Sequence, residues 1–185
     1  MKSVVLGLAG AMGSGKGTVS HYLVDKYGFS KFRMSDVFRD IVLRLHIEES
    51  RENISLVSRV VREAFGQDVL SKVIAQDVEK VPGDVVIDGI RRNTDIEHLK
   101  KNPQFFLIYI DVDIQCRYNR LILRAENTGD STKTFEDFLR DQKLEAENQV
   151  ECLRDLSHYI LENNGDIQHL YSQIDVIVKT IKSIS

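Results

Sequence analysis

Residues 10–18 read Gly-Ala-Met-Gly-Ser-Gly-Lys-Gly-Thr, and this glycine-rich segment constrains the fold of the 185-residue chain more than any other. It follows an apolar, β-branched run at residues 4–8 and opens a segment at 16–27 whose apolar positions have helical spacing. A G-x-x-x-x-G-K pattern between a strand and a helix is typical of a loop that binds phosphate through backbone N–H groups and a lysine. The segment therefore predicts a phosphate-binding loop.

The residue after Lys16 departs from the usual form of this motif. Ser or Thr normally follows the lysine and ligates Mg²⁺, but here Gly17 stands in that place and Thr18 follows one position later. We therefore expect the metal to be held by phosphate oxygens, water and a carboxylate, and Thr18 to contact the α-phosphate.

Runs of strand length alternate along the chain with segments of helical periodicity. Strands are expected at residues 4–8, 32–34, 85–88, 105–110 and 159–161. Helices are expected at residues 16–27, 35–46, 48–80 (divided at Gly66), 93–101, 113–125 and 135–156, and after a turn at 163–165. This alternation predicts an α/β fold in which a parallel sheet is covered by helices on both faces.

The bulk composition excludes several classes of protein. A formal net charge of −3 does not indicate nucleic acid or an acidic membrane as the main partner. The apolar run near the N-terminus is too short to span a membrane and lacks the features of a signal peptide, so we expect a cytoplasmic protein. Cys116 and Cys152 show no CxxC or Cys/His spacing, so neither a disulfide framework nor a zinc site is expected.

Charged residues follow two of the expected strands, where ligands bind in a parallel sheet. Asp36 and Arg39 follow the second strand, and Asp88, Arg91 and Arg92 end or follow the third. A carboxylate at position 88 is suited to hold Mg²⁺ through water beside the lysine. Arg39 and Arg91 are suited to clamp the phosphate of an acceptor. A solvated aspartate and surface salt bridges are the alternative interpretations.

A basic helix precedes a glycine-containing loop at residues 127–134. Arg117, Arg120 and Arg124 recur at spacing i, i+3, i+7 on this helix, and Arg140 follows the loop. The pattern fits a solvated basic face. It equally fits a lid that closes over bound phosphates and excludes water, which a kinase requires because water competes with the acceptor.

Several motifs together resemble nucleoside monophosphate kinases of the adenylate kinase type. They are residues 10–18, Ser-Asp-Val-Phe-Arg at 35–39 and Asp-Gly-Ile-Arg at 88–91. The chain is most similar to the adenylate-kinase-related and dephospho-CoA-kinase-like P-loop proteins of archaea and some bacteria, because Arg-Glu-Ala-Phe-Gly at 62–66 and Asn-Asn-Gly at 163–165 also match.

The resemblance covers nearly the whole chain and implies a three-layer P-loop kinase fold. The implied sheet has five parallel strands in the order 2-3-1-4-5, with helices on both faces and a short lid. Residues 1–185 would form a single domain, in which residues 36–80 bind the acceptor and residues 117–141 form the lid region.

The same resemblance implies roles for individual residues, with ATP and Mg²⁺ as cofactors and a small nucleotide as acceptor. ATP would be bound by Gly13, Ser14, Gly15, Lys16, Gly17, Thr18, Arg117 and Asn164. The acceptor would be bound by Asp36, Arg39, Arg91 and Arg92. The catalytic groups would be Lys16, Arg39, Asp88, Arg91, Arg120 and Arg140, with Asp88 supporting the metal through water.

Departures from the family leave the acceptor open. Adenylate kinases have Pro before the arginine that follows the third strand; here Arg91 arrives one residue sooner and Arg92 occupies the usual place, so either arginine is a candidate clamp. The lid also has no long insertion. A nucleoside or deoxynucleoside monophosphate kinase is expected first. The alternatives are a hydroxyl-directed kinase such as dephospho-CoA kinase, with Asp36 as the base, and a nucleotide-dependent ATPase or switch. The oligomeric state is left open.

Overall fold

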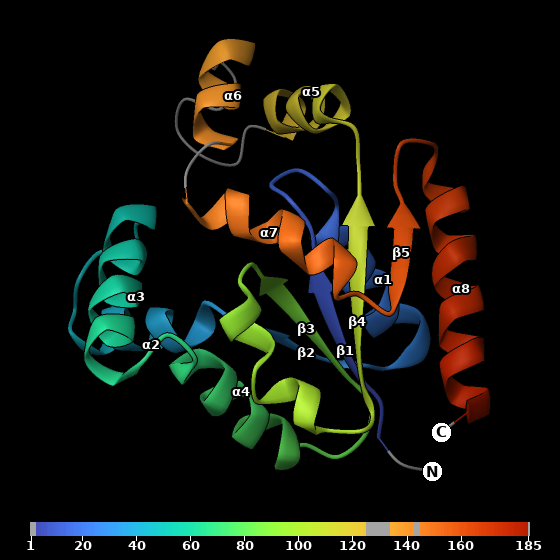
Figure 1. Ribbon diagram of the computed structural model, residues 1–185, viewed down its shortest axis with the longest axis horizontal. Coiled ribbons are helices and arrows are strands. Elements are labelled where there is room, and N and C mark those ends of the chain that lie inside the picture. Colours follow the sequence, from blue (N-terminus) through green and yellow to red (C-terminus); the bar gives the residue numbers. More distant parts are fainter. Residues whose placement is uncertain (1–2, 125–133, 143–144, 185) are drawn as a thin grey trace.

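A computed structural model of the protein describes residues 3–124, 134–142 and 145–184. Its centre is a five-stranded sheet with the order β2-β3-β1-β4-β5, in which all neighbouring strands are parallel (Figure 1). The strands are β1 (Val5–Ala9), β2 (Ser30–Arg33), β3 (Val85–Ile90), β4 (Phe105–Asp111) and β5 (Tyr159–Glu162). The expected fold class and strand order are confirmed.

Helices cover both faces of the sheet and extend beyond one of its edges. The helices on one face are α1 (Lys16–Tyr27) and α8 (Ile167–Ile184). Those that pack on the other face are α2 (Asp36–Arg44), α3 (Arg51–Phe65), α4 (Val69–Glu79) and α7 (Glu145–Asp155). Helices α5 (Ile114–Arg124) and α6 (Phe135–Gln142) lie beyond the carboxyl ends of the strands (Figure 1).

The prediction of one helix at residues 93–101 is wrong. The structure has two short 3₁₀ helices instead, η1 (Asn93–Ile96) and η2 (Leu99–Lys101). An α-helix through this region would need the backbone N–H of His98 to bond a carbonyl one turn earlier. That N–H donates instead to the buried Oγ of Ser71 on α4, at 2.9 Å, which interrupts the helical ladder.

Alternate residues of β1 belong to two separate hydrophobic cores. Val5 and Ala9 face a core that includes α2, α4 and α7, whereas Leu6 and Leu8 face the core formed with α1 and α8. A strand buried on both faces has no polar side to expose, which explains its continuous apolar sequence.

None of the helices in the described part of the chain is both long enough and apolar enough to cross a membrane.

Helix α8 is attached to α1 by a polar cluster around Asp175. Its carboxylate accepts hydrogen bonds from the hydroxyls of Tyr22 (2.8 Å) and Tyr27 (2.7 Å) and pairs with Lys26 (2.7 Å). The hydrogen bond from Lys26 is the largest cause that lowers the pKa of Asp175 to about 2, and burial raises the pKa of Tyr27 to about 12. Tyr22 also stacks on Tyr171 of α8, with ring centroids 3.9 Å apart. The helix that begins at the glycine-rich loop is thus fixed to the C-terminal helix.

This cluster predicts an acid-sensitive contribution to stability. The folded pKa of Asp175, about 2, lies below its ordinary value of 3.8, so the ionised carboxylate stabilises the fold above that value and the contribution is lost as the pH falls through about 2. We expect Asp175→Asn to lower the free energy of unfolding equally at about pH 5 and about pH 7, and to differ progressively less from wild type below about pH 4. Urea unfolding of both proteins measures this. A difference that stays constant down to pH 2 would contradict it.

Candidate functional site

The loop between β1 and α1 lies at the carboxyl end of the central strand, with Lys16 folded over it. The Nζ atom of Lys16 donates hydrogen bonds to the backbone oxygens of Gly10 (2.6 Å) and Ala11 (2.9 Å). The loop is tightened by a turn in which the N–H of Ser14 bonds to the oxygen of Ala11 at 3.1 Å. The start of α1 directs backbone N–H groups and a partial positive charge towards the loop, which favours an anion there.

Two glycines of the loop occupy positions that a side chain would disrupt. Gly13 and Gly15 have φ values of 78° and 97°, which L residues with side chains rarely adopt. A Cβ at Gly13 would lie 2.9 Å from the backbone oxygen of Arg117, and one at Gly15 would lie 2.5 Å from the Nδ2 of Asn163. Gly17 differs, because a Cβ there would meet no atom within 4 Å. The missing hydroxyl after the lysine is therefore not imposed by lack of space.

These positions supply a matched pair of substitutions. We expect Gly15→Ala to lower the affinity for ATP about tenfold or more, because the left-handed backbone and the contact with Asn163 both disfavour a side chain. Gly17→Ala removes no contact and lies in helical backbone, so it should retain the affinity. Titration calorimetry with ATP measures both constants. Equal affinities for the two variants would show that the strained conformation of Gly15 does not shape the binding loop.

The turn after β5 packs against this loop through Asn163. Its Nδ2 donates to the backbone oxygen of Ser14 at 2.8 Å, and its own backbone oxygen accepts from Arg120 at 2.7 Å. Asn164 is the residue expected to contact the nucleotide, and its Oδ1 accepts a hydrogen bond from the N–H of Asp113 at 2.8 Å. Asparagines occupy the first two positions of the Asn-Asn-Gly turn, and the sequence alone does not say which of the two contacts the loop.

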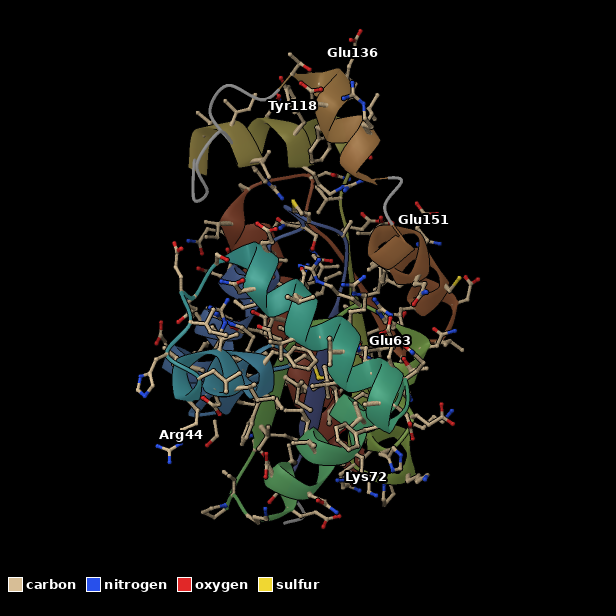
Figure 2. The ribbon with its side chains drawn as sticks, turned by 90° about the vertical axis from the view of Figure 1, so that its left-hand side faces the viewer. Arg44, Glu63, Lys72, Tyr118, Glu136 and Glu151 are labelled. Atoms are coloured by element: carbon tan, nitrogen blue, oxygen red, sulfur yellow. The ribbon has the colours of Figure 1, made fainter. Side chains whose placement is uncertain are left out.

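Helix α5 contacts both the glycine-rich loop and α6. The guanidinium of Arg117 donates to the backbone oxygen of Met12 at 3.4 Å and lies 5.7 Å from the ring of Phe138 on α6. Phe138 is fully buried, and Tyr118 contacts both Phe138 and Phe135, with centroids 5.7 and 5.1 Å apart. Tyr118 lies between α5 and α6 in Figure 2. Sequence reasoning missed this aromatic cluster, although Phe135 and Phe138 stand at helical spacing.

Other residues of the expected lid lie on α6 or outside the described residues. Arg140 pairs with Asp137 of its own helix at 3.2 Å, and its side chain is 77% exposed. The side chain of Arg124 and most of the loop expected at 127–134 lie outside the described residues.

The arginines expected to bind the acceptor emerge at the same edge of the sheet as the loop. They follow β3, which pairs with β1, and β2, which pairs with β3, and all three strands are parallel. On α2, Arg39 pairs with Glu49, and its Nε lies 3.7 Å from the carboxylate of Asp36. Strand β3 ends at Ile90, two residues beyond the expected end at Asp88. Arg91 and Arg92 follow at once. Sequence reasoning missed Glu49.

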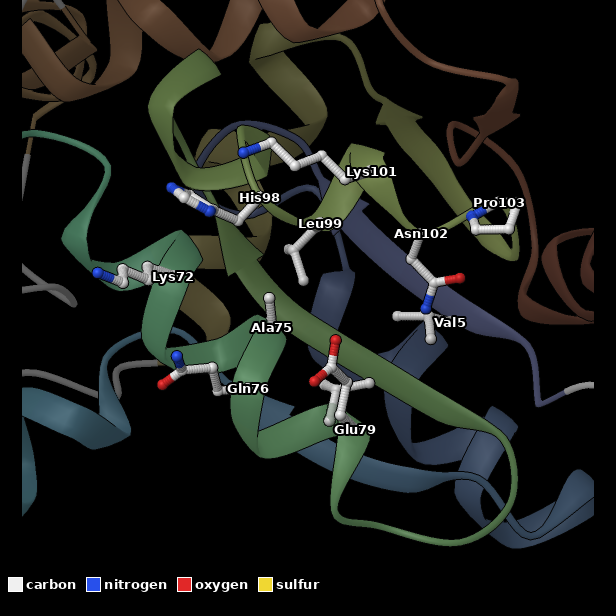
Figure 3. Close-up of a pocket in the computed structure, with 11 residues that line it drawn as sticks. Val5, Lys72, Ala75, Gln76, Glu79, His98, Leu99, Lys101, Asn102 and Pro103 are labelled. Atoms are coloured by element: carbon white, nitrogen blue, oxygen red, sulfur yellow. The ribbon is translucent and has the colours of Figure 1, made fainter.

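A pocket with a volume of about 500 Å³ lies elsewhere on the molecule (Figure 3). It is lined by residues of α4 and η2, among them Lys72, Gln76 and Lys101, and by Val5, the first residue of β1. The glycine-rich loop follows the last residue of the same strand. The pocket is therefore at the opposite edge of the sheet and does not belong to the candidate site.

Curated relatives of similar length match almost the whole chain. A UPF0200 protein of Staphylothermus marinus is 26% identical over 98% of this chain and 94% of its own length. A UPF0200 protein of Pyrococcus abyssi is 28% identical over 96% of this chain and 97% of its own length.

Solved structures show the same fold at low sequence identity. A shikimate kinase from Bacteroides thetaiotaomicron superposes with a TM-score of 0.65 and 15% identity, over 97% of this chain and 98% of that one. A shikimate kinase from Acinetobacter baumannii, solved in complex with shikimate, superposes with a TM-score of 0.55 and 16% identity, over 100% of this chain and 96% of that one. A sequence profile described as an AAA domain (AAA_17) matches residues 9–165, from the glycine-rich loop to the turn after β5. The chain therefore belongs to this AAA domain family of P-loop proteins and has the P-loop kinase fold.

Proposed function

We propose that the protein is an ATP-dependent phosphotransferase that acts on a nucleotide-like small molecule, with a nucleoside or deoxynucleoside monophosphate as the acceptor. The observation that carries the proposal is the arrangement at one edge of the sheet. The glycine-rich loop with Lys16 follows the central strand, and Arg39, Arg91 and Arg92 follow the two strands on one side of it. This arrangement supports the proposal, because transfer between two bound phosphates requires a donor site at the loop with phosphate-binding groups for the acceptor beside it.

The loop fits the phosphates of ATP. Its backbone N–H groups and the start of α1 favour an anion, and Lys16, which now bonds two loop carbonyls, would turn to the β- and γ-phosphates. Within residues 3–124, 134–142 and 145–184, no group of three or more His, Cys, Asp or Glu side chains could hold a metal. Mg²⁺ bound with ATP would take ligands from phosphate oxygens and water, and Asp88 would hold it through water. The ion would neutralise charge on the phosphates.

The chain's own residues would act by position and charge. No covalent nucleophile is needed, because Lys16 and the arginines would stabilise the charge on the transferring phosphoryl group in the transition state. Residues 36–80 would bind the acceptor, and residues 117–141 would form the lid within a single domain. Arg117 and Arg120 already contact the loop and the turn beside it. Arg140 now pairs with Asp137 of its own helix and would have to leave that pair to bind the phosphates.

A hydroxyl acceptor, as in dephospho-CoA, is the second candidate. It is favoured by Asp36, whose carboxylate is 54% exposed at the start of α2 and thus open to an incoming hydroxyl. Such an acceptor needs a base to accept its proton, whereas a phosphate acceptor does not. Asp36→Asn distinguishes the two, because it should lower kcat strongly only for a hydroxyl acceptor.

ATP consumption against a panel of acceptors tests the proposed function. The panel contains nucleoside monophosphates, deoxynucleoside monophosphates, nucleosides and dephospho-CoA, together with shikimate because structural neighbours are shikimate kinases. Rapid turnover with one monophosphate is the expected result, and turnover with a hydroxyl acceptor would support the second candidate. ATP hydrolysis without dependence on any acceptor would contradict the kinase and favour an ATPase or switch.

A further inference from the structure

Asp95 is a buried carboxylate that the expected site did not include. Its side chain is 3% exposed, and it forms an ion pair with Arg62 of α3, whose side chain is 6% exposed, at 2.7 Å between Oδ1 and a terminal guanidinium nitrogen. A charge of this kind is costly to bury unless every oxygen is bonded. The contacts of its second oxygen therefore indicate what the residue does.

The second oxygen of Asp95 holds the backbone of both candidate clamp residues. Its Oδ2 accepts hydrogen bonds from the N–H groups of Arg91 (3.0 Å) and Arg92 (3.1 Å). The N–H of Asp95 in turn donates to the backbone oxygen of Arg92 at 3.0 Å. Two consecutive peptide groups bonded to one carboxylate have little freedom in φ and ψ, so the directions in which their side chains leave the turn are set as well.

Arg62 connects this turn to the acceptor-binding helical region. Besides its bond to Asp95, its guanidinium donates to the backbone oxygen of Gln67, in the link between α3 and α4. One buried ion pair therefore joins α3, the α3–α4 link and the turn after β3. No other polar contact described for these segments joins all three.

We propose that Asp95 is a positioning residue for the acceptor: it orients Arg91 and Arg92, and Arg62 ties their turn to α3. The inference rests on the proposed function, since it assigns these arginines to an acceptor phosphate. A guanidinium fork binds phosphate through directed hydrogen bonds, so a small rotation of the turn weakens binding. The donor loop lies on a different strand, and its geometry should not depend on Asp95.

The test compares Arg62→Met/Asp95→Asn with Arg62→Met/Asp95→Ala. Both lack the ion pair, but only asparagine keeps a carbonyl oxygen that can accept from the N–H groups of Arg91 and Arg92. We expect the alanine variant to have an acceptor KM about tenfold or more above that of the asparagine variant, with equal KM values for ATP. Amide hydrogen exchange at Arg91 and Arg92 should also be faster in the alanine variant, and this measurement does not require activity.

Asp84 supplies the control. It also accepts a backbone N–H, from Val4 at 2.9 Å, and pairs with a cation, Lys182 at 2.8 Å, but it stands before β3 at the far edge of the sheet. Asp84→Asn and Asp84→Ala should not differ in acceptor KM. If the alanine variant at position 95 does not fold, Asp95→Glu keeps the charge and displaces the carboxylate by one methylene, and it should raise the acceptor KM alone.

The outcomes separate the two proposals. Absence of acceptor-dependent turnover in the wild-type protein contradicts the proposed function. Unchanged exchange at Arg91 and Arg92 contradicts the anchoring by Asp95, whether or not the protein is a kinase. Faster exchange with an unchanged acceptor KM, or with an equal rise in both KM values, shows a structural role only and overturns the positioning.

Discussion

Lys16→Ala is expected to lower kcat for phosphoryl transfer about 100- to 1,000-fold, the usual effect of removing one preorganised group that stabilises transition-state charge. In the structure, the Nζ of Lys16 donates hydrogen bonds to the backbone oxygens of Gly10 and Ala11, so the ammonium lies against the loop that is proposed to bind the phosphates. Alanine cannot reach a phosphate from this position. The fold should persist, because the side chain contributes to neither hydrophobic core.

Lys26→Ala on the same helix is the matched control. Lys26 pairs with Asp175 on the side of α1 that faces α8, away from the loop. This substitution should retain kcat and KM. Initial rates at saturating ATP and acceptor, with circular dichroism to verify folding, measure both variants. Retention of wild-type kcat by Lys16→Ala would remove the lysine from the mechanism, whereas an equal loss in Lys26→Ala would show that the effect is one of stability.

The fold was predictable because its signals are local. β1 is buried on both faces and therefore apolar throughout. Helix α1 ends at Tyr27, the expected residue, and Gly28 follows it with a φ of 72°. The helix expected at residues 93–101 failed for a non-local reason, since Ser71 on α4 takes the hydrogen bond of His98. Side chains from distant elements leave no periodic pattern in the segment that they interrupt.

In the candidate site, too, the local features could be predicted from the sequence and the contacts between distant residues could not. The glycine-rich loop is a contiguous motif, and it lies between β1 and α1 as the sequence predicted. Asn163 meets Ser14 across 149 positions, and Asp95 meets Arg62 across 33 positions, so neither contact has a signature in the local sequence. Asp95 also resembles an ordinary acidic residue in the first turn of a short helix, and only its burial distinguishes it.

Breaking the ion pair between Arg62 and Asp95 is expected to have the largest effect on stability. Arg62→Met leaves the carboxylate of Asp95 buried without its cation, and Asp95→Ala leaves the guanidinium without its anion. Each should cost about 3–5 kcal/mol in the free energy of unfolding, the usual effect of an uncompensated buried charge. Lys182→Met, which breaks the pair with Asp84, should cost less than about 1 kcal/mol because that lysine is 41% exposed.

The double variant Arg62→Met/Asp95→Asn should be more stable than Arg62→Met alone. It contains no buried charge, and its largest penalty is the side-chain NH₂ group of the introduced asparagine, which has no acceptor and costs about 1–3 kcal/mol. Urea unfolding of the wild type, both single variants (Arg62→Met and Asp95→Asn) and the double variant gives the coupling free energy of the pair. Additive losses would mean that the two charges do not interact, and the turn carrying Arg91 and Arg92 would then not be tied to α3. A double variant that regains stability but loses acceptor affinity relative to wild type would show that the ionic link to α3, beyond the hydrogen bonds to the turn, contributes to orienting the arginines.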